Sequence, residues 1–209
     1  MFEGGGMQRA YNLRVPDVDG PVPLVVSMHG ALGNADALDR VSGWPEIAER
    51  EAVALLTPGK NTKPGGIWNL DPDGQDVAYL RQLLDEVEDD VCVDLDRVYL
   101  TGFSQGGMLS LILACGEPDR FAAIAPVAGM IDIDCDDRTT PVIAFHGTAD
   151  DVVGFDGVQA DPEMVGYADG PSVPELAEAW DAELVVDDGG HEWPSGAAER
   201  SWEFFEEHP

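Results

Sequence analysis

Gly102-Phe103-Ser104-Gln105-Gly106 is the stretch that decides the fold, because of what stands on each side of it. An apolar strand-like run over 97–101 precedes it, and an apolar helix-like run over 108–114 follows. A G-x-S-x-G sequence at a strand-to-helix turn is typical of a nucleophile elbow, where a strained serine stands between glycines that let strand and helix approach closely. The pattern predicts that the Ser104 hydroxyl stands above a sheet as a nucleophile.

Strand-like and helix-like segments alternate along the whole chain, which predicts a single domain over 1–209 with a mainly parallel sheet and helices on both faces. Seven strands are expected at 11–15, 23–28, 52–57, 97–101, 121–127, 141–145 and 183–186. Helices are expected at 35–51 with an interruption before Pro45, at 76–89, at 108–114, at 172–180 and at 197–206. Ser172 and Glu175 form a capping-box signature, while 58–74 and 151–170 are expected loops.

The net charge is extreme: 41 acidic residues stand against 11 basic ones, for a formal charge of −30. The apolar fraction of 44% separates the chain from a disordered acidic segment. We therefore expect a folded protein with an acidic surface, of the kind used in the cytoplasm of salt-accumulating microbes, and an ordinary acidic protein is the alternative. Self-repulsion of this size is relieved by salt, and it argues against nucleic acid or an anionic membrane as partners.

No leader segment is recognised in the polar, glycine-rich start of the chain, so a cytoplasmic location is expected. The three cysteines, Cys92, Cys115 and Cys135, make no metal-binding spacing. They allow one disulfide without indicating which pair forms it, and buried free thiols are the alternative. Because dinucleotide and metal motifs are missing from the sequence, no cofactor and no metal are expected.

A serine nucleophile needs a base, and the four histidines can be compared by position. His29 precedes Ser104, whereas in folds built around such a nucleophile elbow the catalytic residues follow one another along the chain as serine, acid and histidine. His208 lies next to the last residue, and His146 ends an expected strand just before a glycine, as a structural turn histidine would. His191 lies in a glycine-containing loop between the last strand and the last helix, and it is the predicted base.

The predicted acid is Asp150, which follows the expected strand 141–145. Loops at the carboxyl ends of parallel strands are where such sites are assembled. Asp151 is the nearest rival, and Asp132, Asp134 and Asp156 fit less well.

Backbone N–H groups should stabilise the oxyanion that forms on the substrate. The N–H of Gln105 starts the helix after the elbow, and that of Ala31 follows the strand 23–28. Leu32 is the alternative donor if the turn is one residue longer. A donor of this kind is worth roughly 3–4 kcal/mol in the transition state.

With these residues in place, the chain resembles the polyhydroxybutyrate-depolymerase and feruloyl-esterase-like branch of the α/β-hydrolases. The resemblance covers nearly the whole chain in order, through the segments 9–11, 15–16, 23–30, 68–69, 76–79, 92–94, 97–99, 102–107, 121–129, 146–150 and 190–194. It implies a serine esterase with Ser104 as nucleophile, Asp150 as acid and His191 as base.

Two departures narrow what the resemblance implies. Family members are often secreted and bridged by several cysteines, which this chain does not match, and the eleven residues between Gly129 and Pro141 are too few for a lid domain. A soluble short-chain ester is therefore the expected substrate. Leu32, Trp68, Val153 and Trp193 are the predicted pocket residues, with Trp193 equally able to serve in packing.

The sequence thus predicts a cofactor-independent serine esterase acting on a small-molecule ester, with its oligomeric state undetermined. A peptidase or a thioesterase using the same three residues is the alternative enzyme. A binding protein that has kept the fold without catalysis is the alternative from another class.

Overall fold

The computed structural model describes residues 2–4, 7–59, 66–158 and 169–209. Its centre is a seven-stranded sheet in the order β3-β5-β4-β6-β7-β8-β9. β3 pairs antiparallel with β5 at one edge, and all other neighbours are parallel. The strands are β3 (Tyr11–Arg14), β4 (Val22–Met28), β5 (Ala54–Pro58), β6 (Val93–Phe103), β7 (Ala123–Val127), β8 (Ile143–Gly147) and β9 (Glu183–Asp187). The predicted mainly parallel sheet is confirmed.

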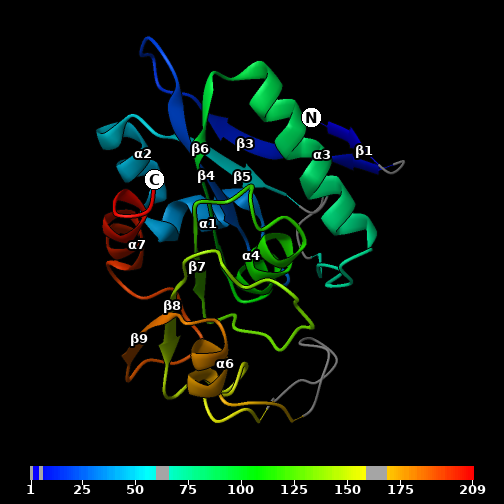
Figure 1. Ribbon diagram of the computed structural model, residues 1–209, viewed down its shortest axis with the longest axis vertical. Coiled ribbons are helices and arrows are strands. Elements are labelled where there is room, and N and C mark those ends of the chain that lie inside the picture. The colour runs from blue at the N-terminus through cyan, green and yellow to red at the C-terminus, as the bar shows by residue number, and fades with distance from the viewer. Residues whose placement is uncertain (1, 5–6, 60–65, 159–168) are drawn as a thin grey trace.

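The helices form two layers, one on each face of the sheet (Figure 1). α3 (Gln75–Asp90), α4 (Gln105–Gly116) and α6 (Val173–Ala179) supply buried residues to one hydrophobic cluster. α2 (Trp44–Glu51) and α7 (Ala197–Glu206) supply the other cluster and contact each other, while α1 (Ala35–Ser42) precedes α2. Successive residues of β4 alternate between the clusters, because side chains of a strand point to opposite faces. Both faces of the central strands are therefore buried, which explains their continuous apolar runs.

The predicted interruption of the first helix is confirmed at Gly43. This residue has φ 79°, ends α1 and starts α2, and Pro45 occupies the first turn of α2. A positive φ costs glycine little, so the chain can turn here between two short helices. The capping box at Ser172 and Glu175 is also present, with both reciprocal hydrogen bonds formed.

A short antiparallel hairpin, β1 (Phe2–Gly4) with β2 (Met7–Arg9), precedes the main sheet and was not predicted. It ends at Arg9, whose side chain is buried and forms an ion pair of 2.6 Å with the buried Asp76 at the start of α3. The Arg9 guanidinium also lies over the ring of Tyr79, 4.2 Å from its centroid. One buried cation thus connects the start of the chain to α3.

Cys115, in the last turn of α4, is bonded to Cys135 in the segment that follows β7. Cys92 is a free thiol and is exposed. The structure therefore selects one of the pairings that the sequence left open. No helix within the described ranges combines the length and the apolar character needed to cross a membrane.

Candidate active site

Ser104 occupies the turn between β6 and α4 in the conformation that the elbow pattern predicts. Its φ of 54° and ψ of −121° lie outside the regions that non-glycine residues normally populate. The surroundings hold it there, because its N–H donates to the Val127 carbonyl at 2.8 Å and its carbonyl accepts from the Met108 N–H at 3.0 Å. Strain maintained in this way is typical of a functional turn.

The two glycines of the elbow are required by close packing rather than by flexibility. A Cβ on Gly106 would overlap the carbonyl of Met28 in β4, and a Cβ on Gly102 would overlap the backbone of Gly106. The backbone of the first turn of α4 therefore lies in direct contact with the backbones of β4 and β6, and this close packing leaves no room for a side chain at Gly102 or Gly106.

Asp150 and His191 are brought together, although 41 positions separate them. The imidazole Nδ1 of His191 lies 2.8 Å from Oδ2 of Asp150, and the histidine ring lies against the ring of Phe103, with centroids 4.8 Å apart. Phe103 directly precedes Ser104, so this contact places the imidazole beside the elbow. A carboxylate on Nδ1 leaves Nε2 of His191 as the nitrogen able to accept a proton.

The Asp150 carboxylate is buried and held by four donors. Oδ1 accepts from the N–H groups of Val152 and Val153, each at 2.9 Å, while Oδ2 contacts His191 and also Nε2 of His146 at 3.3 Å. Burial by itself would raise the pKa of the Asp150 carboxyl. The hydrogen bonds from His146 and His191 outweigh burial and hold this pKa well below its usual range. The acid therefore stays ionised beside His191.

The loop that follows β4 lies against the elbow, as the predicted oxyanion site requires. A Cβ on Gly30 would come within 3.2 Å of the Ser104 Cβ. The Leu32 N–H already donates to the Gly66 carbonyl at 2.9 Å, whereas the Ala31 N–H has no acceptor among the described residues. The Leu32 N–H is thus already engaged, and Ala31 stays the predicted donor together with Gln105, the first residue of α4.

Trp68 supports this loop from the interior. Its indole N–H donates to the His29 carbonyl at 2.7 Å, and its ring lies against the His29 ring, with centroids 4.8 Å apart. Its backbone N–H donates to Oε1 of Gln105 at 2.9 Å. Trp68 therefore connects both segments that carry the predicted oxyanion donors, a role that its position between expected elements did not indicate.

The predicted pocket residues fall into two groups. Leu32 is 58% exposed and Trp193 is half-buried against the cluster that contains α7, so both can meet a ligand. Trp68 and Val153 are 2% and 1% exposed, with side chains in the core. Their place in the substrate pocket stays a prediction. The loop over 151–170 is also expected to form one wall of the pocket, because it carries the apolar residues Val152, Val153, Phe155, Met164 and Tyr167, with a plain surface loop as the alternative. It is described only at 151–158 and 169–170, so Met164 and Tyr167 lie outside the described residues.

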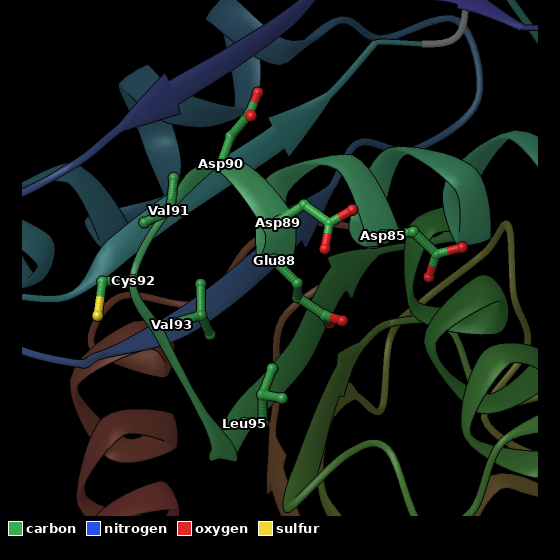
Figure 2. Close-up of a pocket in the computed structure, with 8 residues that line it drawn as sticks. All are labelled: Asp85, Glu88, Asp89, Asp90, Val91, Cys92, Val93 and Leu95. Atoms are coloured by element: carbon green, nitrogen blue, oxygen red, sulfur yellow. The ribbon is translucent and has the colours of Figure 1, made fainter.

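A separate hollow lies at the other end of β6, between the end of α3 and the start of that strand (Figure 2). Its lining residues are Asp85, Glu88, Asp89, Asp90, Val91, Cys92, Val93 and Leu95. Leu95 stands nine residues before Ser104, so the two places are roughly 30 Å apart along an extended strand. The hollow is therefore no part of the site at the elbow. Within the described residues, no group of three or more histidine, cysteine or acidic side chains could hold a metal ion.

A mostly parallel sheet with a strained serine between β6 and α4, and an acid–histidine pair after β8 and β9, defines an α/β-hydrolase. Comparison with known proteins agrees. The model of the prolyl oligopeptidase family matches residues 71–141, which contain β6, the elbow and α4. A probable feruloyl esterase C of Aspergillus niger is 29% identical over 227 residues, covering 94% of this chain and 83% of that protein. A putative esterase, NocK, of Nocardia uniformis subsp. tsuyamanensis is 35% identical over 202 residues, covering 88% of this chain and 58% of the relative.

Solved structures support the same fold. A thermostable esterase superposes with a TM-score of 0.68 at 21% identity, covering 99% of this chain and 61% of that one. Esterase PE8 superposes with a TM-score of 0.71 at 20% identity, covering 97% of this chain and 100% of that one. Together these comparisons support an α/β-hydrolase esterase of the feruloyl-esterase-like type.

Proposed function

We propose that this esterase cleaves carboxylic esters through Ser104, His191 and Asp150, with an acyl-enzyme intermediate. The hydrogen bond between Asp150 and His191, beside the elbow that carries Ser104, is the observation that supports this assignment most strongly. In the first step, Nε2 of His191 takes the Ser104 proton while Oγ attacks the ester carbonyl carbon. The protonated imidazole then donates that proton to the departing alcohol as the ester C–O bond breaks.

Hydrolysis of the acyl-enzyme repeats this chemistry with water. His191 removes a proton from the attacking water, the tetrahedral intermediate collapses, and Ser104 leaves with the proton returned. Asp150 keeps the Nδ1 proton of His191 oriented throughout and stabilises the imidazolium. The N–H groups of Ala31 and Gln105 would hold the oxyanion in both halves.

The decisive experiment measures hydrolysis of p-nitrophenyl acetate and butyrate in concentrated potassium chloride by the wild type, Ser104→Ala and His191→Ala. Loss of several orders of magnitude in kcat for both variants, with unchanged far-UV circular dichroism, supports the proposal. A folded variant that keeps wild-type turnover would overturn the assignment of that residue.

We propose short-chain esters as the substrates, because only eleven residues separate Gly129 from Pro141 and these leave no room for an inserted lid domain. The feruloyl esterase relatives make methyl ferulate the second substrate to test. A series of p-nitrophenyl esters with acyl chains of increasing length should show kcat/KM falling beyond the short acyl groups. A maximum at long chains would contradict this assignment.

A peptidase using the same three residues is the second candidate, favoured by the match of residues 71–141 to the prolyl oligopeptidase family. Esterase and peptidase activity can be distinguished by the leaving group, which is an alcohol in an ester and an amine in an amide. Ester substrates and the corresponding p-nitroanilides with identical acyl groups should be compared, and a higher kcat/KM on the anilides would favour the peptidase.

We further propose that the protein works in molar salt and presents an acidic surface. The net charge of −30 supports this, as do clusters such as Asp85, Glu88 and Glu117 gathered around Arg120, each with an oxygen 2.7–2.9 Å from its guanidinium. Far-UV circular dichroism should collapse on dialysis to low salt and return with potassium chloride. A fold indifferent to salt would overturn this proposal.

A cytoplasmic location is also our proposal, supported by the suitability of this composition for a salt-rich cytoplasm. Disulfides persist chiefly in oxidising compartments, so the state of Cys115 and Cys135 in cells is informative. The bond between Cys115 and Cys135 weighs against a cytoplasmic location unless it forms only after lysis. The proposal therefore expects thiol labelling of freshly lysed cells to find the pair reduced, and a pair already oxidised in cells would favour an extracytoplasmic location.

We also propose that neither nucleic acid nor an anionic membrane is a partner, because the net charge of −30 would repel both.

A further inference from the structure

We propose that His146 is a positioning residue for the reaction, because it holds the Asp150 carboxylate in the orientation that His191 needs. This inference rests on the proposed function, since it assigns a task to a group that acts through Asp150. His146 lies in β8 four residues before Asp150, and its side chain is completely buried. The sequence favours a structural turn histidine at this position, because His146 ends an expected strand and Gly147 follows it at once. That spacing does not show which way the imidazole points.

The Asp150 carboxylate has a donor on every side. The backbone N–H groups of Val152 and Val153 occupy Oδ1. On Oδ2, Nδ1 of His191 lies at 2.8 Å and Nε2 of His146 at 3.3 Å. A carboxylate with donors on one oxygen alone can still rotate about the bond that joins it to Cβ. Donors on both oxygens, two of them imidazoles that converge on Oδ2, oppose that rotation.

The tautomer of His146 follows from its other contact. Nε2 also lies 2.8 Å from the Val153 carbonyl oxygen, which can only accept a hydrogen bond. The proton must therefore be on Nε2, where it is shared between the Val153 carbonyl and Oδ2 of Asp150. Nδ1 of His146 is buried and has no hydrogen-bond partner among the described residues, so the ring acts as a donor through Nε2 alone.

These contacts form a closed cycle. The Val153 N–H donates to Asp150 Oδ1, the Val153 carbonyl accepts from His146, and His146 reaches Asp150 Oδ2. The turn after β8 is thus tied to the strand through the same imidazole that contacts the acid. Because the cycle contains Asp150 itself, a shift of His146 displaces the carboxylate from His191.

A merely structural histidine would act through packing alone, and two substitutions separate the cases. His146→Gln can place an amide N–H near the position of Nε2, whereas His146→Leu fills similar space without a donor. Phe145→Leu is the matched control. Phe145 is the buried residue next to His146 in β8, and its side chain packs in the hydrophobic cluster that contains α2 and α7.

The test measures kcat and KM for p-nitrophenyl butyrate together with the free energy of unfolding, in concentrated potassium chloride. We expect His146→Leu to lower kcat about 10- to 100-fold with little change in KM, the range found when a residue that orients a metal-binding histidine or carboxylate is lost. His146→Gln should recover most of kcat, and Phe145→Leu should lose stability while kcat stays within about twofold of wild type. Equal kcat losses in the Gln and Leu variants, or in the Phe145 control, would overturn the proposal.

A second measurement keeps this test apart from the test of the proposed function. The Nδ1 proton of His191, bonded to Asp150, can be followed by NMR in protein labelled with ¹⁵N-histidine, without any substrate. We expect its low-field signal to be shifted or lost in His146→Leu and retained in His146→Gln. An unchanged signal in His146→Leu overturns the positioning role even if no ester is turned over. Activity that survives Ser104→Ala would instead overturn the proposed function.

Discussion

Trp68 donates its backbone N–H to the side-chain Oε1 of Gln105 over 2.9 Å, and this hydrogen bond joins the segment that precedes α3 to the first residue of the nucleophile helix. The same tryptophan donates its indole N–H to the His29 carbonyl. Both predicted oxyanion segments are thus held by one buried residue, the first through its backbone N–H and the second through its indole N–H.

Replacing Trp68 with phenylalanine should therefore lower kcat more than it raises KM. The substitution removes the indole donor, leaves the His29 carbonyl without that partner, and frees the loop that carries Ala31. We expect kcat to fall about 10-fold or more, measured on p-nitrophenyl butyrate in high salt. The control is Trp202→Phe in α7, because the buried indole nitrogen of Trp202 has no hydrogen-bond partner among the described residues and its ring packs in the cluster that contains α7. Equal kcat values for both variants would contradict this account.

The depressed pKa of the Asp150 carboxyl makes stability depend on pH in a defined window. The folded state binds this proton less readily than the unfolded chain, where the pKa of an aspartate is about 3.9. The stabilisation is therefore complete above that value and is lost as pH falls through the lower, folded pKa. Urea unfolding of wild type and Asp150→Asn between about pH 2 and pH 6 should show their difference shrinking on acidification. A difference that grows instead would mean that the pKa is raised.

Removing only one partner of the buried ion pair between Arg9 and Asp76 should lower the free energy of unfolding strongly. Arg9→Met leaves a buried carboxylate without its cation, which typically destabilises by about 3–5 kcal/mol. The double variant Arg9→Met with Asp76→Leu should recover most of that loss, because an apolar pair needs no charge compensation. Arg50→Met is the control, since the Arg50 pairs are exposed, and it should unfold at nearly the wild-type urea concentration. A double variant no better than Arg9→Met would contradict the argument.

Gly106→Ala should abolish the native fold near the elbow, because the added methyl group would overlap the Met28 carbonyl. Gly190→Ala, whose Cβ would find its nearest neighbour at 3.8 Å, should fold normally. Near-ultraviolet circular dichroism in high salt distinguishes the two. A well-folded Gly106→Ala protein would show that strand and helix can separate at this point.

Much of this architecture could be predicted, because in several segments the local sequence preference and the packing in the folded protein favour the same structure. The apolar run of β4 is buried on both faces, the capping box at Ser172 starts α6, and the glycines around Ser104 meet a steric requirement. The expected positions of the sheet strands and helices differ from those observed by a few residues at their ends.

What could not be predicted depends on which way side chains point across long separations. The sequence places Arg9 and Asp76 far apart, and nothing in it states that a hairpin brings the arginine under α3. His146 shows the same limit, because its rank among the four histidines came from chain position, whereas its contact with Asp150 comes from the turn that follows β8. The cysteine pairing was likewise open until the end of α4 and the segment after β7 were placed together.

The bond between Cys115 and Cys135 closes a loop of chain that contains the whole of β7. With the two sulfurs joined, the last turn of α4 cannot drift far from the sheet unless the strand it encloses leaves as well. The nucleophile helix and β7 should therefore open as one cooperative unit, and their amide hydrogens should exchange with solvent at a common, slow rate. Reduction would divide that unit, so the C-terminal end of α4 would exchange first while the serine at its other end stayed protected.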